Sequence, residues 1–174
     1  MLWLALPQAL AQPTVPPSPP DRPVEVFAEL DGIWSGQFVG YDAQGKELYR
    51  IDVRQEYTTV DAHTQKVEIR DAMQDGMVIT GRGVNVAKLV DGRLSLSCVV
   101  DKSNGDHVEH QGRIVTLPSG EPGLVWSSVR KGRSETFLEY VTEENGKAVY
   151  RIQGTGRYGD TLIVMSGRYV KGGT

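Results

Sequence analysis

Two histidines and a glutamate lie close together in the segment "DHVEH", as His107, Glu109 and His110. Histidine and glutamate are common zinc ligands, so this segment is the first candidate for a metal site. If the segment is a β-strand, however, His107 and His110 point to opposite faces and could not hold one ion together. The segment is also one residue shorter than the H-x-x-E-H motif of helical zinc sites. We therefore predict no metal site.

His110 is nevertheless the best candidate for a functional polar side chain. It shares strand parity with Val108, Gly112 and Ile114, so we expect it to point into the interior of the domain. Two interpretations stay open at this point. His110 is either a hydrogen-bonded histidine of the core or a residue that contacts a bound ligand.

Three glycines in "GTGRYGD" match the spacing Gly-x-Gly-x-x-Gly, as Gly154, Gly156 and Gly159. A dinucleotide site needs a helix directly after these glycines, because the helix N-terminus holds the pyrophosphate. The segment that follows, "TLIVMSGRYV", has the composition of a strand. We therefore predict no nucleotide site and no cofactor.

The single cysteine, Cys98, excludes an intrachain disulfide. It alternates with Leu94 and Leu96 in "RLSLSCVV", which indicates a small buried residue rather than an activated nucleophile. The chain shows no Ser-His-Asp arrangement, no paired carboxylates and no phosphate-binding loop. We expect its acidic and basic residues on the solvent-facing side of a sheet. Catalysis stays open, because active sites assemble in space, but these patterns favour a non-catalytic protein.

The composition is that of a globular domain. A chain of 174 residues is long enough for one domain with its own core. The net charge of −3 provides no basic surface for nucleic acid or anionic lipid. Twenty glycines are many for this length and are typical of turn-rich β structure. We predict one domain that neither binds nucleic acid nor inserts into a membrane.

The first residues differ in composition from the rest. The run "MLWLALPQALA" is uncharged, ends in the small-x-small pattern of a cleavage site, and is too short to span a bilayer. Seven of the nine prolines lie at or before Pro23, so the segment that follows is expected to be an extended tether. We predict a signal peptide at 1–11, a proline-rich linker at 12–26, and a secreted or periplasmic location.

From residue 30 onward, apolar residues alternate with polar ones, and short turn segments separate the alternating runs. In "LYRIDVRQEY", Tyr49, Ile51 and Val53 share one face, and charged residues occupy the other. Nine connections, among them the hairpin signal Asp91-Gly92, indicate ten strands. The expected ranges are 32–41, 47–58, 64–71, 77–90, 93–102, 107–116, 123–130, 134–142, 147–157 and 160–170.

An open sheet of ten consecutive strands would expose two edges, and closure into a barrel removes both. We therefore predict an all-β, up-and-down antiparallel barrel over residues 27–174, with no substantial helix. A ten-stranded barrel is wider than an eight-stranded one, so its side chains need not fill the interior. Gly112, Gly154 and Gly156 fall within expected strands. Such glycines mark either a bend needed for closure or room for a ligand, and both interpretations stay open.

The segment "ELDGIWSGQF" begins the first expected strand with Gly32-x-Trp34. The glycine permits a tight entry, and we expect Trp34 to cover one end of the barrel. Arg168, in "SGRYV" of the last strand, is the candidate to stack on the indole.

These three residues resemble the first-strand and last-strand signatures of the calycin superfamily, which includes lipocalins, fatty-acid-binding proteins and nitrobindin-like barrels. The resemblance implies a barrel that is closed at one end and open to a ligand at the other. The chain departs from those families in three respects. Lipocalins have eight strands and usually a C-terminal helix, whereas this sequence predicts ten strands and no substantial helix. The chain also has no room for the helix pair of fatty-acid-binding proteins, and its last third lacks the histidine that holds haem in nitrobindin-like proteins.

We therefore expect the barrel to bind a small, largely apolar molecule without transforming it. The predicted lining residues are His110, Trp126, Tyr49, Ile51, Val53, Leu96 and Tyr150. One alternative is a barrel with a filled interior that acts through its outer surface. A second is an enzyme that uses the cup as a reaction chamber, with His110 or a tyrosine as acid or base.

Overall fold

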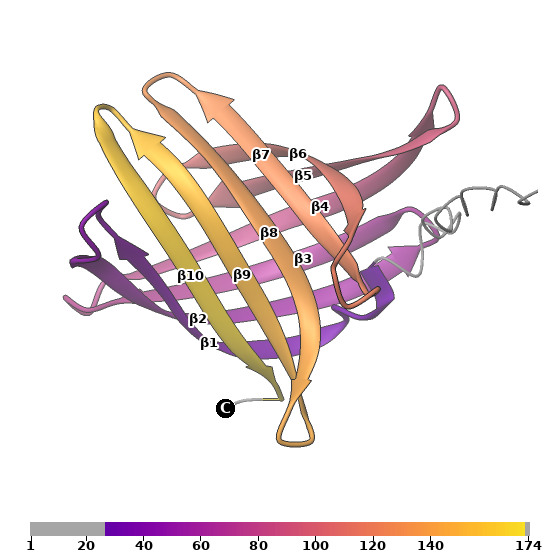
Figure 1. The fold of residues 1–174 in the computed structure, drawn as a ribbon, viewed down its shortest axis with the longest axis horizontal. Coiled ribbons are helices and arrows are strands. Elements are labelled where there is room, and N and C mark those ends of the chain that lie inside the picture. Colours follow the sequence, from indigo (N-terminus) through magenta and orange to yellow (C-terminus); the bar gives the residue numbers. More distant parts are fainter. Residues whose placement is uncertain (1–26, 173–174) are drawn as a thin grey trace, which may run out of the picture.

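The computed structural model describes residues 27–172. They form ten antiparallel strands closed into one barrel, in which each strand pairs with its neighbours in sequence and β10 pairs with β1 (Figure 1). The strands are β1 (Gly32–Tyr41), β2 (Glu47–Asp61), β3 (Thr64–Met73), β4 (Val78–Val90), β5 (Arg93–Lys102), β6 (His107–Thr116), β7 (Pro122–Arg130), β8 (Arg133–Glu144), β9 (Lys147–Tyr158) and β10 (Thr161–Lys171). The predicted all-β, ten-stranded barrel is confirmed. The predicted signal peptide at 1–11 and linker at 12–26 lie outside the described residues.

The strand boundaries follow from local turn chemistry. Between β4 and β5, Asp91 and Gly92 have φ angles of 49° and 72°, as a two-residue hairpin turn requires. Within the strands, burial alternates strictly over residues 78–85 of β4, where Ile79, Gly81 and Gly83 are buried and the residues between them are exposed. Alternation therefore assigns one face of each strand to the barrel interior.

One end of the barrel is closed by the short turn before β1. Phe27 and Leu30 of this turn are buried, and so is Trp34, whose Nε1 donates a hydrogen bond to the Leu30 carbonyl oxygen at 2.6 Å. Gly32 links the turn to β1 with a φ of 109°, a conformation that residues with a side chain rarely adopt. Gly32 and Trp34 thus occupy the positions expected for residues that close the barrel.

The expected stacking of Arg168 on Trp34 is wrong, and the register of β1 with β10 explains why. Trp34 lies opposite Lys171, whereas Arg168 lies opposite Gln37. The Lys171 Nζ atom is 5.2 Å from the centroid of the Trp34 ring. Arg168 points to the outside of the barrel, where its Nη2 atom is 2.9 Å from Glu144 Oε2.

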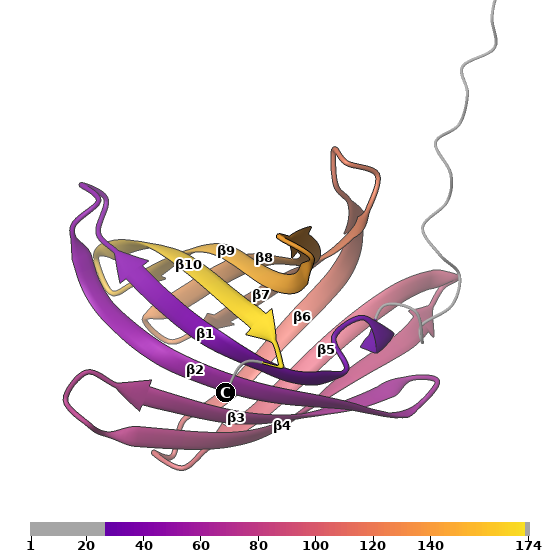
Figure 2. The same ribbon diagram turned by 90° about the horizontal axis from the view of Figure 1, so that it is seen from below.

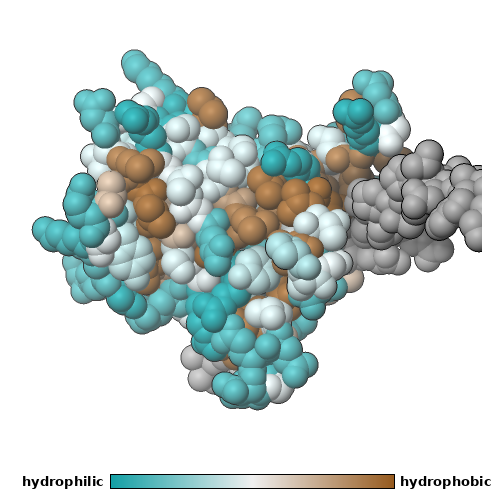
Figure 3. All heavy atoms as spheres, viewed as in Figure 1, coloured by the Kyte–Doolittle hydropathy of each residue, from teal (hydrophilic) through white to brown (hydrophobic). Residues whose placement is uncertain are grey.

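The opposite end of the barrel carries the turns β1–β2, β3–β4, β5–β6, β7–β8 and β9–β10, because consecutive strands alternate in direction (Figures 1 and 2). The N-terminal turn lies at the other end, beside the start of β1 (Figure 2). No helix within residues 27–172 is long and apolar enough to cross a membrane. The face shown in Figure 3 is largely hydrophilic or intermediate, with separate hydrophobic areas.

Candidate ligand-binding lumen

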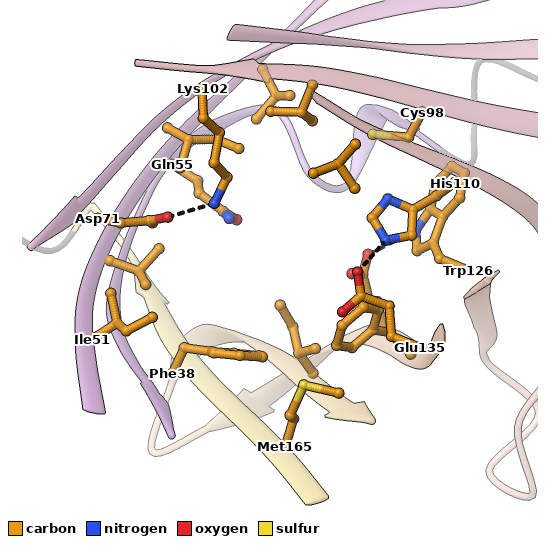
Figure 4. A pocket seen from close by; sticks show the side chains of 18 of the residues that line it. Phe38, Ile51, Gln55, Asp71, Cys98, Lys102, His110, Trp126, Glu135 and Met165 are labelled. Carbon is orange, nitrogen blue, oxygen red and sulfur yellow. Dashed lines mark hydrogen bonds and ion pairs between the residues drawn. The ribbon is translucent and has the colours of Figure 1, made fainter. Parts of the chain in front are cut away.

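The barrel encloses a cavity of about 550 Å³, to which all ten strands contribute side chains. Every second side chain of a strand points into the barrel, and many of these side chains line the cavity. In β2 they are Tyr49, Ile51, Val53, Gln55 and Tyr57. Apolar side chains form most of the wall, namely Leu30, Phe38, Ile51, Val53, Val67, Ile69, Met73, Ile79, Val100, Val108, Phe137, Ile152 and Met165. Figure 4 shows several of these side chains pointing into the open space. The alternative of a solidly filled interior does not agree with this cavity.

Six of the seven residues predicted to line the lumen do line it: Tyr49, Ile51, Val53, His110, Trp126 and Tyr150. The seventh, Leu96, is fully buried in the packed core instead. Leu96 is the cross-strand partner of Ala87 on one side and of Gly112 on the other. The Trp126 ring packs directly against Gly112. Neighbouring side chains therefore cover Leu96 and separate it from the cavity.

Two of the glycines that fall within strands, Gly112 and Gly154, make room for aromatic rings of the neighbouring strand. A Cβ atom on Gly112 would lie 2.4 Å from Cε3 of Trp126. A Cβ atom on Gly154 would lie 2.4 Å from Cδ1 of Phe137. At these two positions the close neighbour is therefore an aromatic ring of the cavity wall, whereas a Cβ atom on Gly156 would lie 3.1 Å from Cε of Met165.

Glu135 of β8 is the centre of a polar cluster near the open end. Its Oε2 atom accepts hydrogen bonds from Arg133 Nη2 at 2.9 Å and from the Tyr158 hydroxyl at 2.9 Å. Its Oε1 atom faces His110 Nε2 at 3.6 Å, an ion-pair distance too long for a hydrogen bond (Figure 4). Burial by itself would raise the pKa of Glu135, but His110, Arg133 and Tyr158 outweigh it and lower the pKa to about 2. Glu135 is therefore a fixed negative charge at neutral pH.

Two further ion pairs lie near the same end. Lys102 Nζ is 2.9 Å from Asp71 Oδ2, on the side of the cavity across from His110 (Figure 4). Arg130 Nη1 is 2.6 Å from Asp106 Oδ1. Lys102, Arg130 and Arg133, near the mouth of the lumen, are therefore each paired with a carboxylate.

Glu139, also of β8, lies deeper in the lumen. Its Oε2 atom accepts hydrogen bonds from the Tyr150 hydroxyl at 2.6 Å and from Trp126 Nε1 at 2.9 Å. Burial raises the pKa of Glu139, and the bond from Tyr150, the charge of His110 and the bond from Trp126 only partly oppose it. Glu139 is half-buried and lines the lumen.

These inward carboxylates were not predicted, because acidic residues were expected on the solvent-facing side of the sheet. In "SETFLEYV", Glu135 and Glu139 share parity with Phe137 and Val141. The other face of the strand also carries apolar residues, at Leu138 and Tyr140. The alternation of β8 is thus ambiguous, and the shared parity with Phe137 is the signal that could have revealed both glutamates.

The histidines of "DHVEH" and the cysteine have no arrangement for metal or thiol chemistry within residues 27–172. His107 and His110 do point to opposite faces: His107 is exposed and contacts Asp101 and Glu109, whereas His110 lines the lumen. No group of three potential ligands within residues 27–172 is placed to hold a metal ion. Cys98 lines the lumen, and burial raises the pKa of its thiol to about 12.

The fold and cavity define a closed β-barrel with a ligand-sized lumen, and similar chains occur among solved structures. The S-type phycobiliprotein lyase CPES from Guillardia theta is 11% identical, with a TM-score of 0.59 over 86% of this chain and 92% of that chain. A redesigned β-barrel, mFAP1 bound to DFHBI, is 14% identical, with a TM-score of 0.42 over 84% of this chain and 98% of that chain. At such low identity the likeness to the lyase shows the barrel fold alone. No protein-family model and no curated protein matches the chain.

Proposed function

We propose that the protein binds one small, largely apolar molecule in its lumen without transforming it. The observation that carries this proposal is the cavity of about 550 Å³, which lies within the ordinary size range of small-molecule sites. Apolar walls favour an apolar ligand body, since its transfer from water contributes roughly 25 cal/mol per Å² of buried surface. The charges at the mouth are paired with one another and need no ligand charge to balance them.

The geometry of the lumen supports a carrier rather than a filled scaffold. The N-terminal turn and Trp34 close one end, so a ligand enters and leaves only through the other. The barrel expected from the calycin resemblance has this same form. We include His110 in the proposed site as a polar contact halfway along the wall, because its Nε2 atom is buried without a hydrogen-bond partner in the described structure.

The test compares two tryptophan substitutions at adjacent positions of β2. Ile51 points into the cavity, whereas Asp52 is exposed on the outside. Ile51→Trp should narrow the lumen and weaken binding of the apolar dye ANS by about tenfold, which corresponds to roughly 1.4 kcal/mol. Asp52→Trp should leave dye affinity unchanged. Equal affinities in both variants, or no saturable binding by the native protein, would contradict the proposal.

We further propose that the protein is exported, on the basis of the uncharged apolar run and Ala-Leu-Ala pattern at its N-terminus. Expression of the full chain with a C-terminal tag should yield a product whose first residue lies shortly after Ala11. A product that retains Met1 and stays in the cytoplasmic fraction would contradict export and leave the binding proposal unaffected.

A further inference from the structure

Glu139 differs from the other carboxylates of the lumen in the kind of partner it has. Asp71, Asp106 and Glu135 each contact a lysine or arginine within 2.9 Å. The hydrogen bonds to Glu139 come instead from two neutral donors, the Tyr150 hydroxyl and the Trp126 indole. An ionised carboxylate in an apolar enclosure without a cation is unfavourable, because burial penalises the charged form.

The hydrogen-bond geometry determines where a proton on Glu139 would sit. Both neutral donors bond to the same oxygen, Oε2. An oxygen that accepts two hydrogen bonds is poorly placed to carry a proton as well, so the proton belongs on Oε1. A protonated carboxyl has one O–H donor, and on Oε1 this donor is free of both Tyr150 and Trp126.

Among the titratable groups of residues 27–172 that lie around Glu139, none is a lysine or arginine that could pair with its carboxylate. They come from five strands: Tyr57 of β2, Cys98 of β5, His110 of β6, Tyr150 of β9 and Tyr169 of β10. Burial raises the pKa of the cysteine and the three tyrosines, so these four groups are neutral at pH 7. His110 is also engaged by Glu135, whose Oε1 atom it faces.

Glu139 also lines a second, smaller crevice of about 20 Å³ at the closed end, together with Leu30 and Tyr150. Of these two spaces, both formed by residues 27–172, the lumen alone has room for a ligand. A ligand group that reaches Glu139 must therefore come from the lumen side.

The following inference rests on the proposed function. We propose that Glu139 holds its proton at neutral pH, and that its Oε1–H group donates a hydrogen bond to an acceptor atom of the bound ligand. The ligand class is therefore a neutral, largely apolar molecule with a carbonyl oxygen or ring nitrogen at its buried end. A ligand with a carboxylate at that end is disfavoured, since the cations of the lumen lie at the mouth and are already paired.

The protonation of Glu139 is tested first, on the ligand-free protein. Infrared difference spectra of the native protein and Glu139→Gln at pH 7 should show the carbonyl band of a protonated carboxylic acid only in the native protein. Glutamine keeps an oxygen to accept from Tyr150 and Trp126 and keeps an N–H donor, so this variant should unfold at nearly the native temperature. A carboxylate band in place of the acid band would overturn the inference.

Recognition is tested with two uncharged fluorescent probes of similar size. One is the ketone 6-propionyl-2-(dimethylamino)naphthalene, which has an acceptor oxygen, and the other is diphenylhexatriene, a hydrocarbon without one. Glu139→Leu should weaken ketone binding by roughly three- to tenfold, the value of one hydrogen bond, and shift the bound emission to the blue. Diphenylhexatriene should bind the native protein, Glu139→Gln and Glu139→Leu equally well.

The outcomes separate this inference from the proposed function. If diphenylhexatriene and the ketone both fail to bind the native protein, the proposed function itself is wrong. If both probes bind but Glu139→Leu weakens neither, or weakens both equally, the lumen binds ligands and only the role of Glu139 is wrong. Glu139→Gln keeps an N–H donor and should retain its affinity for the ketone. Loss of affinity in Glu139→Leu alone then shows that a hydrogen bond, and not a change in the shape of the lumen, holds the ketone.

Discussion

Lys171 and Trp34 are cross-strand partners at the closure of the barrel, and the Lys171 ammonium lies 5.2 Å from the centre of the indole ring. The same lysine passes close to Gly32, because a Cβ atom added to that glycine would lie 3.2 Å from Lys171 Cε. Lys171 therefore contacts both Gly32 and Trp34, and this contact joins the last strand to the first where the barrel closes.

Replacing Lys171 should destabilise the barrel more than replacing Arg168. Lys171→Met keeps the apolar stem but removes the charge over Trp34, and it should lower the free energy of unfolding by about 0.5–1 kcal/mol. Arg168→Met breaks only a solvent-exposed pair with Glu144, and it should change stability little. Urea unfolding of the two variants checks the difference. A larger loss for Arg168→Met would contradict the assignment of Lys171 as the stacking residue.

Glu135 should make stability depend on pH in the acidic range. Its pKa is about 2 in the folded protein and near the ordinary value of 4.5 when unfolded, so its contribution is complete above pH 4.5. The contribution is lost as the pH falls from about 4.5 towards 2. The free energies of unfolding of the native protein and Glu135→Gln should therefore differ more at pH 6 than at pH 3. A difference that does not change with pH would show that Glu135 is not stabilised as a charge.

Cys98 should react slowly with thiol reagents in the folded protein. Its thiol pKa is raised to about 12 by burial, so at pH 8 very little thiolate is present. The rate with 5,5′-dithiobis(2-nitrobenzoate) should be at least roughly 10²-fold lower than in urea, where the thiol has an ordinary pKa. Because Cys98 is the only cysteine, the measured rate belongs to it alone. A folded-state rate close to that in urea would contradict its burial in the wall.

Gly112 should not tolerate a methyl group, because the Trp126 ring occupies the space above it. In Gly112→Ala the new Cβ would clash with Trp126, which must move and weaken its bond to Glu139. We expect a loss of about 1–3 kcal/mol, typical of an overpacked site, and a changed near-ultraviolet circular dichroism spectrum.

Gly81 is the matched control for this substitution. It is also a buried strand glycine, but an added Cβ would approach no atom closer than 3.4 Å. Gly81→Ala should therefore be neutral or slightly stabilising, because alanine restricts the unfolded chain. Equal losses in the two variants would indicate a backbone requirement rather than contact with Trp126.

Much of the architecture could be predicted from the sequence, because the signals that specify it are local. Hairpin residues such as Asp91 and Gly92 adopt their backbone angles whatever lies around them. Alternation along β2 correctly placed Tyr49, Ile51 and Val53 on the inner face. These features depend only on residues a few positions apart, and so does the number of strands.

The contacts of the site were decided by tertiary structure, because they depend on the register between strands. Whether Lys171 or Arg168 meets Trp34 follows from how β10 aligns with β1 across the closure, and no local pattern encodes that alignment. The hydrogen bonds to Glu139 likewise depend on the fold, because Tyr150 and Trp126 come from two other strands. The sequence by itself determined a ten-stranded barrel with an apolar inner face. The fold decided which polar groups share its interior, since packing brings together residues that are distant along the chain.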